Sequence, residues 1–199
     1  MNRKKWLVPG IILGIVALFA LSVIGGYNGL VTQRENVQKS LANVQTQYQR
    51  RADLVPNLVN TVKGAAGFEQ KTLTDVTNAR AKATSIQIDP SKATPQQLQQ
   101  YQQSQGELSQ ALGRLLAVSE AYPQLQATAA FRDLQVQLEG TENRITVARK
   151  DFNDAANTYN TRLQRFPTNI TAGLFGFDKF TYFQATSAAQ TAPTVNFGQ

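Results

Sequence analysis

The 199-residue sequence contains no cysteine and no histidine. Without cysteine, the chain cannot form disulfides, thiolate metal sites or a cysteine nucleophile. Without histidine, it lacks the side chain used most often as a general base and as a metal ligand. Ser-x-x-Lys and Gly-x-Ser-x-Gly patterns are also missing, and no strand-like segment leads into a glycine-rich phosphate loop. The sequence therefore predicts no catalytic residue, no metal site and no cofactor, and it favours a protein that is not an enzyme.

Basic residues outnumber acidic ones, with 20 Lys and Arg against 13 Asp and Glu. Arg3, Lys4 and Lys5 lie together at the N-terminus, and the other charges are spread along the chain with mixed signs. Surfaces that bind nucleic acid usually combine clustered basic residues with aromatic ones, and this pattern is not found. We therefore expect solvated helix faces and no nucleic-acid partner.

Residues 7–26 carry no charge and include one hydroxyl residue, Ser22. Twenty helical residues span about 30 Å, the thickness of the hydrocarbon core of a bilayer. Trp6 and Tyr27 flank the run, where aromatic residues favour the membrane interface. A cleaved signal peptide is the alternative, with Ala20-Leu21-Ser22 as a cleavage site. Because a helical pattern continues directly from Tyr27, we expect residues 1–26 to form a basic N-terminus and an uncleaved transmembrane helix.

The flanking charges favour one orientation of a single-pass protein. Arg3, Lys4 and Lys5 precede the apolar run, whereas Arg34 and Lys39 follow it with Glu35 between them. The positive-inside rule then places the N-terminus in the cytoplasm and the remainder of the chain outside.

Two Gly-x-x-x-Gly spacings, Gly10 to Gly14 and Gly25 to Gly29, lie in or beside the apolar run. This spacing allows two membrane helices to approach closely. We therefore expect three kinds of partner: the lipid bilayer, an unknown protein, and further copies of this chain in a homo-oligomer.

Apolar residues recur at steps of three and four through residues 27–84, 95–121 and 125–166. Each stretch predicts a long helix with coiled-coil-like spacing. Pro56 removes a backbone donor inside the first stretch, so a kink or break is expected near it. The longest uninterrupted pattern, residues 125–166, is the helix along which the others are expected to lie.

The connections between these stretches are short. Thr94-Pro95-Gln96-Gln97 is a capping box with proline at the first helical position, which predicts the start of the second helix. Loops at 85–94 and 122–125 would turn the chain back on itself twice. We therefore predict an all-α fold, in which an N-terminal transmembrane helix precedes an antiparallel bundle of three to four long helices within residues 27–183.

Pro167 is expected to end the last long helix. The segment that follows is rich in large apolar residues up to Phe183, so we expect it to pack on an end of the bundle or on the bilayer surface. Residues 184–199 are mostly small and polar, and they are predicted to be disordered.

Several motifs in order along the chain resemble the LemA family of bacterial membrane proteins. They are Tyr27-Asn28-Gly29-Leu30-Val31, Arg50-Arg51-Ala52-Asp53-Leu54-Val55-Pro56-Asn57-Leu58-Val59, Leu112-Gly113-Arg114-Leu115-Leu116-Ala117-Val118, Leu134-Gln135-Val136-Gln137-Leu138-Glu139-Gly140-Thr141-Glu142-Asn143-Arg144-Ile145, Tyr159-Asn160 and Phe166-Pro167. The resemblance implies one N-terminal helix in a bacterial inner membrane, an antiparallel helical bundle and no established catalytic activity. It also implies an external N-terminus, opposite to the orientation that the charges favour.

Glu139 and Glu142 are three residues apart, so their carboxylates share a helix face. Such a pair can bind a metal ion or share acid–base work. It can also form ion pairs with Arg50, Arg51 or Lys63 that fix the register of the helices. We favour the structural interpretation.

Other polar residues are candidates for structure or interaction. Within the motifs these are Asp53, Arg114, Asn143 and Arg144. Asn153 and Asn160 lie on the apolar seam of the last long helix, where asparagine often fixes partner and register.

The sequence thus predicts a membrane-anchored scaffold or adaptor that acts through protein–protein contacts or self-association. One alternative is a metal-dependent enzyme that uses Glu139 and Glu142. Another is a lipid-binding or membrane-remodelling module that uses the aromatic segment 175–183 at the bilayer surface.

Overall fold

A computed structural model describes residues 4–64 and 67–184, with side chains from residue 9 onward. All regular structure in these residues is helical: α1 (Lys4–Lys63), α2 (Gln70–Ser85), α3 (Pro95–Ser119), α4 (Pro123–Gln126), α5 (Ala129–Gln164) and α6 (Thr168–Phe175). The predicted all-α fold is therefore confirmed. The side chain of Trp6 and the predicted disorder after residue 184 lie outside the described residues.

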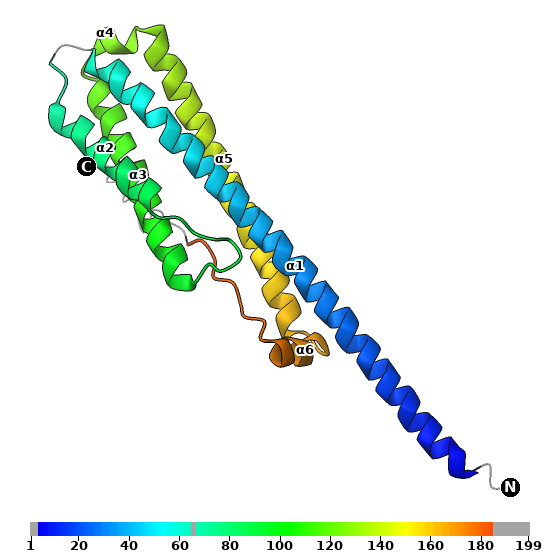
Figure 1. Cartoon of the computed structure of the whole chain (residues 1–199). Coiled ribbons are helices and arrows are strands. Elements are labelled where there is room, and N and C mark those ends of the chain that lie inside the picture. Colours follow the sequence, from blue (N-terminus) through cyan, green and yellow to red (C-terminus); the bar gives the residue numbers. More distant parts are fainter. Residues whose placement is uncertain (1–3, 65–66, 185–199) are drawn as a thin grey trace, which may run out of the picture.

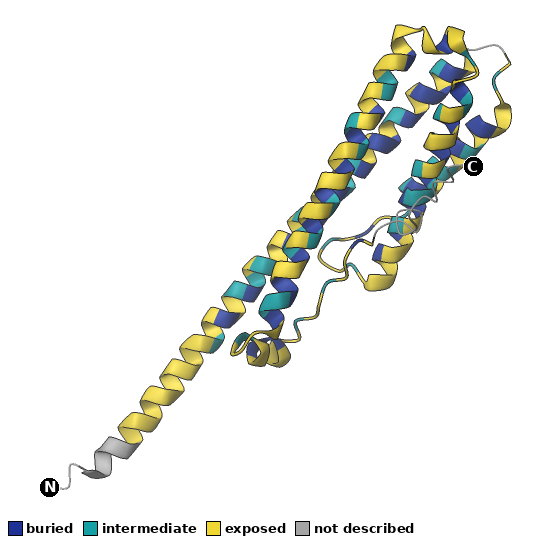
Figure 2. Ribbon diagram, turned by 180° about the vertical axis from the view of Figure 1, so that it is seen from behind, coloured by how far each residue is buried: buried dark blue, intermediate teal, exposed yellow. Residues whose placement is uncertain are grey.

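Helix α1 is one continuous rod of 60 residues. At 1.5 Å per residue it is about 90 Å long. Its first part projects beyond the other helices, and most of the large apolar side chains of residues 11–24 are exposed there (Figure 1, Figure 2). This part has the length and apolar composition needed to cross a membrane.

Helix α1 continues through Pro56 and ends only at Lys63. Proline has no N–H, so the carbonyl of Ala52, four residues earlier, lacks its usual helical donor. Arg80 of α2 supplies a replacement, because its Nε donates to the Ala52 oxygen over 2.8 Å. Of the kink or break expected near Pro56, the break does not occur. The single helix expected over 27–84 divides further on, where Gly67 adopts a φ of +81° between α1 and α2.

Helices α1 and α5 lie side by side along most of α5, and α2 and α3 form a hairpin against them (Figure 1). The capping box that starts α3 is present: the Thr94 hydroxyl accepts from the Gln97 N–H, and the Gln97 side chain accepts from the Thr94 N–H. Helix α5 begins at Ala129, four residues later than expected, because α4 forms a separate turn and Thr128 caps α5.

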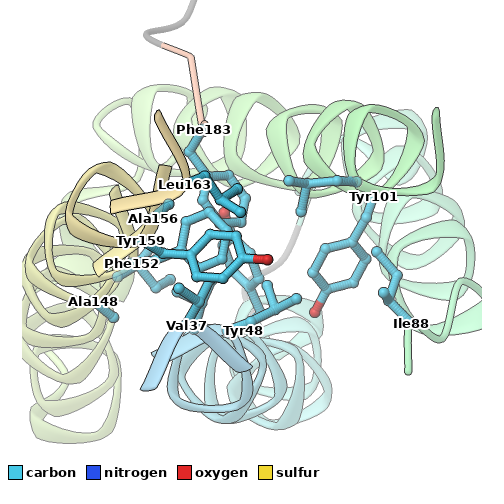
Figure 3. Packing of buried hydrophobic residues seen from close by; sticks show 14 of the residues in the cluster. Val37, Tyr48, Ile88, Tyr101, Ala148, Phe152, Ala156, Tyr159, Leu163 and Phe183 are labelled. Atoms are coloured by element: carbon cyan, nitrogen blue, oxygen red, sulfur yellow. The ribbon is translucent and has the colours of Figure 1, made fainter. Parts of the chain in front are cut away.

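The core consists of two apolar clusters along the bundle. The proximal cluster, nearer the exposed end of α1, contains Leu30, Val37, Leu41, Val44, Tyr48, Ile88, Leu98, Tyr101, Ile145, Ala148, Phe152, Ala156, Tyr159, Leu163, Ala172 and Phe183. In Figure 3, side chains from α1, α5 and the C-terminal segment meet in it. The distal cluster contains Val55, Leu58, Val59, Val62, Leu73, Val76, Ala83, Leu108, Ala111, Leu112, Leu115, Leu125, Phe131 and Leu138.

The chain after α5 turns back along the bundle. Helix α6 packs against α1, where Tyr27 makes edge-to-face contacts with Phe175 and Phe177 at centroid distances of 4.9 and 5.6 Å. The C-terminal segment, residues 177–184, then runs without regular structure along α5 and brings Phe183 into the proximal cluster, where it is 4% exposed. The C-terminal segment thus packs largely on the bundle.

Candidate functional site

A layer of polar side chains separates the two apolar clusters. It is formed by residues from three helices that lie between proximal and distal core positions: Arg51 of α1, Ser104 and Gln105 of α3, and Thr141 and Glu142 of α5. Arg51 is 1% exposed, the most buried charged side chain among the described residues. A buried charge is stable only when it is paired and hydrogen-bonded.

The guanidinium of Arg51 is held on two sides. Its Nη1 donates to Oε1 of Glu142 at 2.8 Å. Its Nη2 donates to both the backbone oxygen and the side-chain Oε1 of Gln105, at 2.9 and 2.7 Å. The ring of Tyr48 lies 5.2 Å from the guanidinium carbon, within the range of a cation–π contact. These contacts join α1 to α3 and α5.

The polar layer also reaches α2. Gln105 uses its side-chain nitrogen to donate to the carbonyl of Ala83 at 3.1 Å, and the Ser109 hydroxyl donates to Glu142 at 3.4 Å. Since each bond fits only one relative position of the helices, the layer fixes the register of α1, α2, α3 and α5. Arg51 Nε is buried and has no hydrogen-bond partner among the residues that the structure describes.

Two tyrosines lie on the proximal side of the layer. Tyr48 and Tyr101 contact each other edge to face, with ring centroids 5.4 Å apart. Burial raises the pKa of both hydroxyls, and the positive charges of Arg149 and Arg51 only partly oppose this effect at Tyr48. Both side chains are therefore neutral at physiological pH, and neither provides a phenolate.

The structure brings together one of the carboxylates considered above and one of the arginines. Glu142 pairs with Arg51, whereas Glu139 and Arg50 point to the surface. Asn143, Arg144 and Arg114 are also exposed, and Asp53 accepts a hydrogen bond of 2.7 Å from Gln49 on the surface of α1. The geometry supports the structural interpretation of Glu142.

The enzyme alternative requires Glu139 and Glu142 to act as a pair of free carboxylates. Glu142 is instead bonded to a cation, which competes directly with a metal ion for its oxygen. Within residues 9–64 and 67–184, no group of three carboxylate, thiolate or imidazole residues is arranged to hold a metal. The polar layer has the chemistry of a structural ion pair rather than of an acid–base site.

Sequence reasoning missed Gln105 and did not identify the partner of two asparagines. Gln105 lies in a glutamine-rich stretch, and nothing in that composition distinguishes it from its exposed neighbours. Within the described residues, the side chains of Asn153 and Asn160 bond to the C-terminal segment rather than to another long helix. Each forms two hydrogen bonds with the backbone of the C-terminal segment, Asn160 at Phe180 and Asn153 at Phe183.

The glycines near the end of the apolar run serve contacts within the chain. A Cβ at Gly29 would overlap the guanidinium of Arg162, and a Cβ at Gly26 would lie 2.9 Å from the Thr171 hydroxyl. Gly10, Gly14 and Gly25 have no such neighbours. Of the spacings considered for self-association, Gly25 to Gly29 is thus partly occupied by α5 of the same chain.

An exposed apolar helix that continues into a helical bundle defines a membrane-associated helical protein. Residues 40–197 match the model of the LemA family. The match covers more than half of the sequence, so this chain belongs to the LemA family, and the resemblance seen in its motifs is confirmed.

The chain is also similar to several individual proteins. Magnetosome protein MamQ 2 of Paramagnetospirillum magneticum is 29% identical over an aligned length of 201 residues. The alignment covers 90% of this chain and 72% of that protein. Magnetosome protein MamQ of Magnetospirillum gryphiswaldense is 27% identical over the same shares. Protein LemA of Metamycoplasma hominis is 23% identical over 171 residues, with 86% of this chain and 74% of that protein covered. None of these names is that of an enzyme.

Proposed function

We propose that this protein is a membrane-anchored scaffold that binds other proteins or further copies of itself and does not catalyse a reaction. The observation that carries the proposal is the continuity of α1, whose apolar part and bundle part are one helix. A helix without a break transmits its direction, so the bundle is held at a fixed angle to the bilayer.

The dimensions suit a rigid projection. From Gly26 to Lys63, α1 extends about 55 Å at 1.5 Å per residue, which places the α4 end of the bundle that far from the membrane. The polar layer around Arg51 supports this role, because it fixes the register of four helices near the middle of the bundle. A rod with a defined register presents the same surface in every copy.

The scaffold proposal is tested by cross-linking the full chain in its native membranes, followed by detergent extraction and mass analysis. The expected result is a set of species heavier than the 21.9-kDa chain. A matched variant, Gly10→Leu with Gly14→Leu, removes the small-residue spacing in the apolar run, and the heavier species should persist in it. Recovery of the monomer alone from both proteins would contradict the proposal.

We place the protein in the inner membrane of a bacterial cell, with the N-terminus in the cytoplasm and the bundle outside. The charges that flank the apolar run support this orientation. Because the chain has no cysteine, Asn2→Cys and Asn57→Cys are clean probes for a membrane-impermeant maleimide on intact cells. We expect labelling of Asn57→Cys alone. Labelling of Asn2→Cys alone would show that the orientation is the opposite one.

A second candidate function is contact with the bilayer surface through α6. This helix lies against α1 just after the apolar run, yet Phe166 and Leu174 beside and within it are 80% and 67% exposed. Ile170 and Phe175 extend the same exposed apolar surface. Such a surface next to a membrane helix suits the interface between headgroups and acyl chains.

An environment-sensitive dye on Leu174→Cys tests the contact with lipid in the full chain reconstituted into vesicles. Blue-shifted emission is expected relative to the same dye on Val147→Cys, an exposed apolar position on α5. Equal emission at the two positions would place α6 in water and reject the lipid contact.

A further inference from the structure

The C-terminal segment is bound to α5 by side chains that contact its backbone. At Phe180, Asn160 donates to the carbonyl at 2.8 Å and accepts from the N–H at 3.0 Å. At Phe183, Asn153 donates to the carbonyl at 3.0 Å and accepts from the N–H at 2.9 Å. Each asparagine thus satisfies both polar backbone groups of one residue, as a neighbouring strand would in a sheet.

The two asparagines have a spacing that suits an extended chain. Seven residues separate Asn153 from Asn160, which is about 10.5 Å along a helix. Three residues separate Phe180 from Phe183, which is about 10 Å in an extended chain. The match sets an antiparallel register, and Arg149 and Gln102 continue it by donating to the carbonyl of Gln184 at 2.7 and 2.6 Å.

Specificity comes from two aromatic contacts. Phe180 packs edge to face on Tyr159 at 5.2 Å, and Phe183 packs on Phe152 at 5.0 Å with the Arg149 guanidinium over its ring. These contacts come from Arg149, Phe152, Asn153, Tyr159 and Asn160, which are together called the α5 groove. The α5 groove holds an extended segment whose aromatic residues are three positions apart. Backbone contacts and spaced side-chain pockets are the usual elements of extended-peptide recognition.

The attachment of the segment allows it to leave its own bundle. Gly176 ends α6 in the left-handed conformation, with φ of +66°, and begins the connection to the bound residues. Phe180, the first residue bound by an asparagine, follows Gly176 by four residues, so this connection spans about 13 Å when extended. Copies anchored in the same bilayer by parallel α1 helices would hold their grooves at the same height, which raises the effective concentration of one tail at the next groove.

We propose that the α5 groove binds residues 177–184 of a second copy of this chain, so that neighbouring copies exchange their C-terminal segments. The fit is already established, because the groove holds this same segment within one chain. Exchange preserves the asparagine and aromatic contacts of Phe180 and Phe183, and it adds a covalent connection between two bundles. The inference deepens the proposed scaffold function and rests on it, since it states which surface joins the copies.

The test uses two tagged copies of the full chain, expressed together in membranes. One carries Gln102→Cys on α3, beside the α5 groove, and the other carries Gln184→Cys on the segment, and a short bis-maleimide is added. The expected product contains both tags. Its yield should rise severalfold when the Gln184→Cys copy also carries Asn153→Asp and Asn160→Asp, because these isosteric changes remove the amide donors that hold its segment in its own groove and leave the other groove intact.

Matched controls fix the interpretation. Asn143→Asp, an exposed position on α5, should leave the yield unchanged, and Val136→Cys in place of Gln102→Cys should give little product. Absence of the two-tag product would overturn the proposal, as would an equal yield with Val136→Cys. If either of these results is found but heavier cross-linked species still form in native membranes, segment exchange is rejected and the scaffold function is retained.

Discussion

The proximal and distal halves of the bundle share α1 and α5 but are closed in different ways. The distal cluster is covered by α2, α3 and α4, so helices surround it. The proximal cluster is covered in part by α6, the loop around Ile88 and the C-terminal segment. Helices satisfy their own backbone groups, whereas the segment depends on side chains of α5 to satisfy its backbone. The C-terminal segment is therefore the part of the proximal cover that can open without loss of a helix.

The largest loss of stability is expected from a change in the polar layer, where the two halves meet. Arg51→Ala removes the cation of the polar layer and takes away the donor of the backbone and side-chain oxygens of Gln105. Breaking a buried pair typically costs 3–5 kcal/mol, and because the Glu142 side chain is 41% exposed, we expect a loss near the lower end, about 3 kcal/mol. Denaturant unfolding in detergent, followed by circular dichroism, measures the loss.

Arg50→Ala is the matched control for that change, because Arg50 is the exposed neighbour of Arg51 on the same helix. Its stability should stay within about 0.5 kcal/mol of the parent. Similar losses in the two variants would mean that the polar layer does not hold the halves together.

The next effect concerns the distal half, where Arg80 supports the helix at Pro56. Arg80→Ala leaves the buried carbonyl of Ala52 without a donor, and we expect a loss of about 2 kcal/mol. Pro56→Ala restores an N–H at the position that normally bonds to this carbonyl, so Arg80→Ala should cost at least about 1 kcal/mol less in that background. A double-mutant cycle measures the coupling. Additive effects would show that Arg80 does not compensate for the proline.

The proximal half should respond locally rather than globally. Asn160→Ala removes both bonds to Phe180, and we expect a local loss of about 1.4 kcal/mol, or about tenfold faster amide exchange in residues 177–184. Exchange in the distal residues 108–115 should be unchanged. Equal acceleration in both regions would mean that the two halves open as one unit.

The smallest effect is expected at the junction with the apolar run. Gly26→Ala places a Cβ against the buried side chain of Thr171, so α6 must shift, at a cost of about 1 kcal/mol. Gly25→Ala meets no neighbour and should leave α6 docked. Exchange of the amides of residues 171–175 distinguishes the two variants, and faster exchange in Gly25→Ala than in Gly26→Ala would contradict the packing.

Local patterns predicted the parts of this fold that depend on local chemistry. The apolar run, the α3 capping box and the apolar seams all follow from nearest neighbours in sequence. The continuity of α1 through Pro56 did not follow, because the compensating donor is Arg80, in another helix. Predicting the loss of a hydrogen bond is simple, whereas predicting its replacement requires the tertiary structure.

The candidate site shows the same division. Spacing placed Glu139 and Glu142 on one helix face, but only packing decided that Glu142 meets Arg51 while Glu139 faces solvent. The heptad spacing of Asn153 and Asn160 was visible in the sequence. Their partner was not, because an extended segment bound by side chains has no periodic pattern of its own.

A distance along α1 tests most directly whether one helix carries the bundle from the membrane. Spin labels on Val16→Cys, in the apolar run, and Asn60→Cys, beyond Pro56, can be measured by pulsed electron resonance in the full chain in lipid nanodiscs. An unbroken helix predicts a single narrow distance near 65 Å, from 1.5 Å per residue. A broad distribution, or a distance well below this value, would contradict the continuous rod.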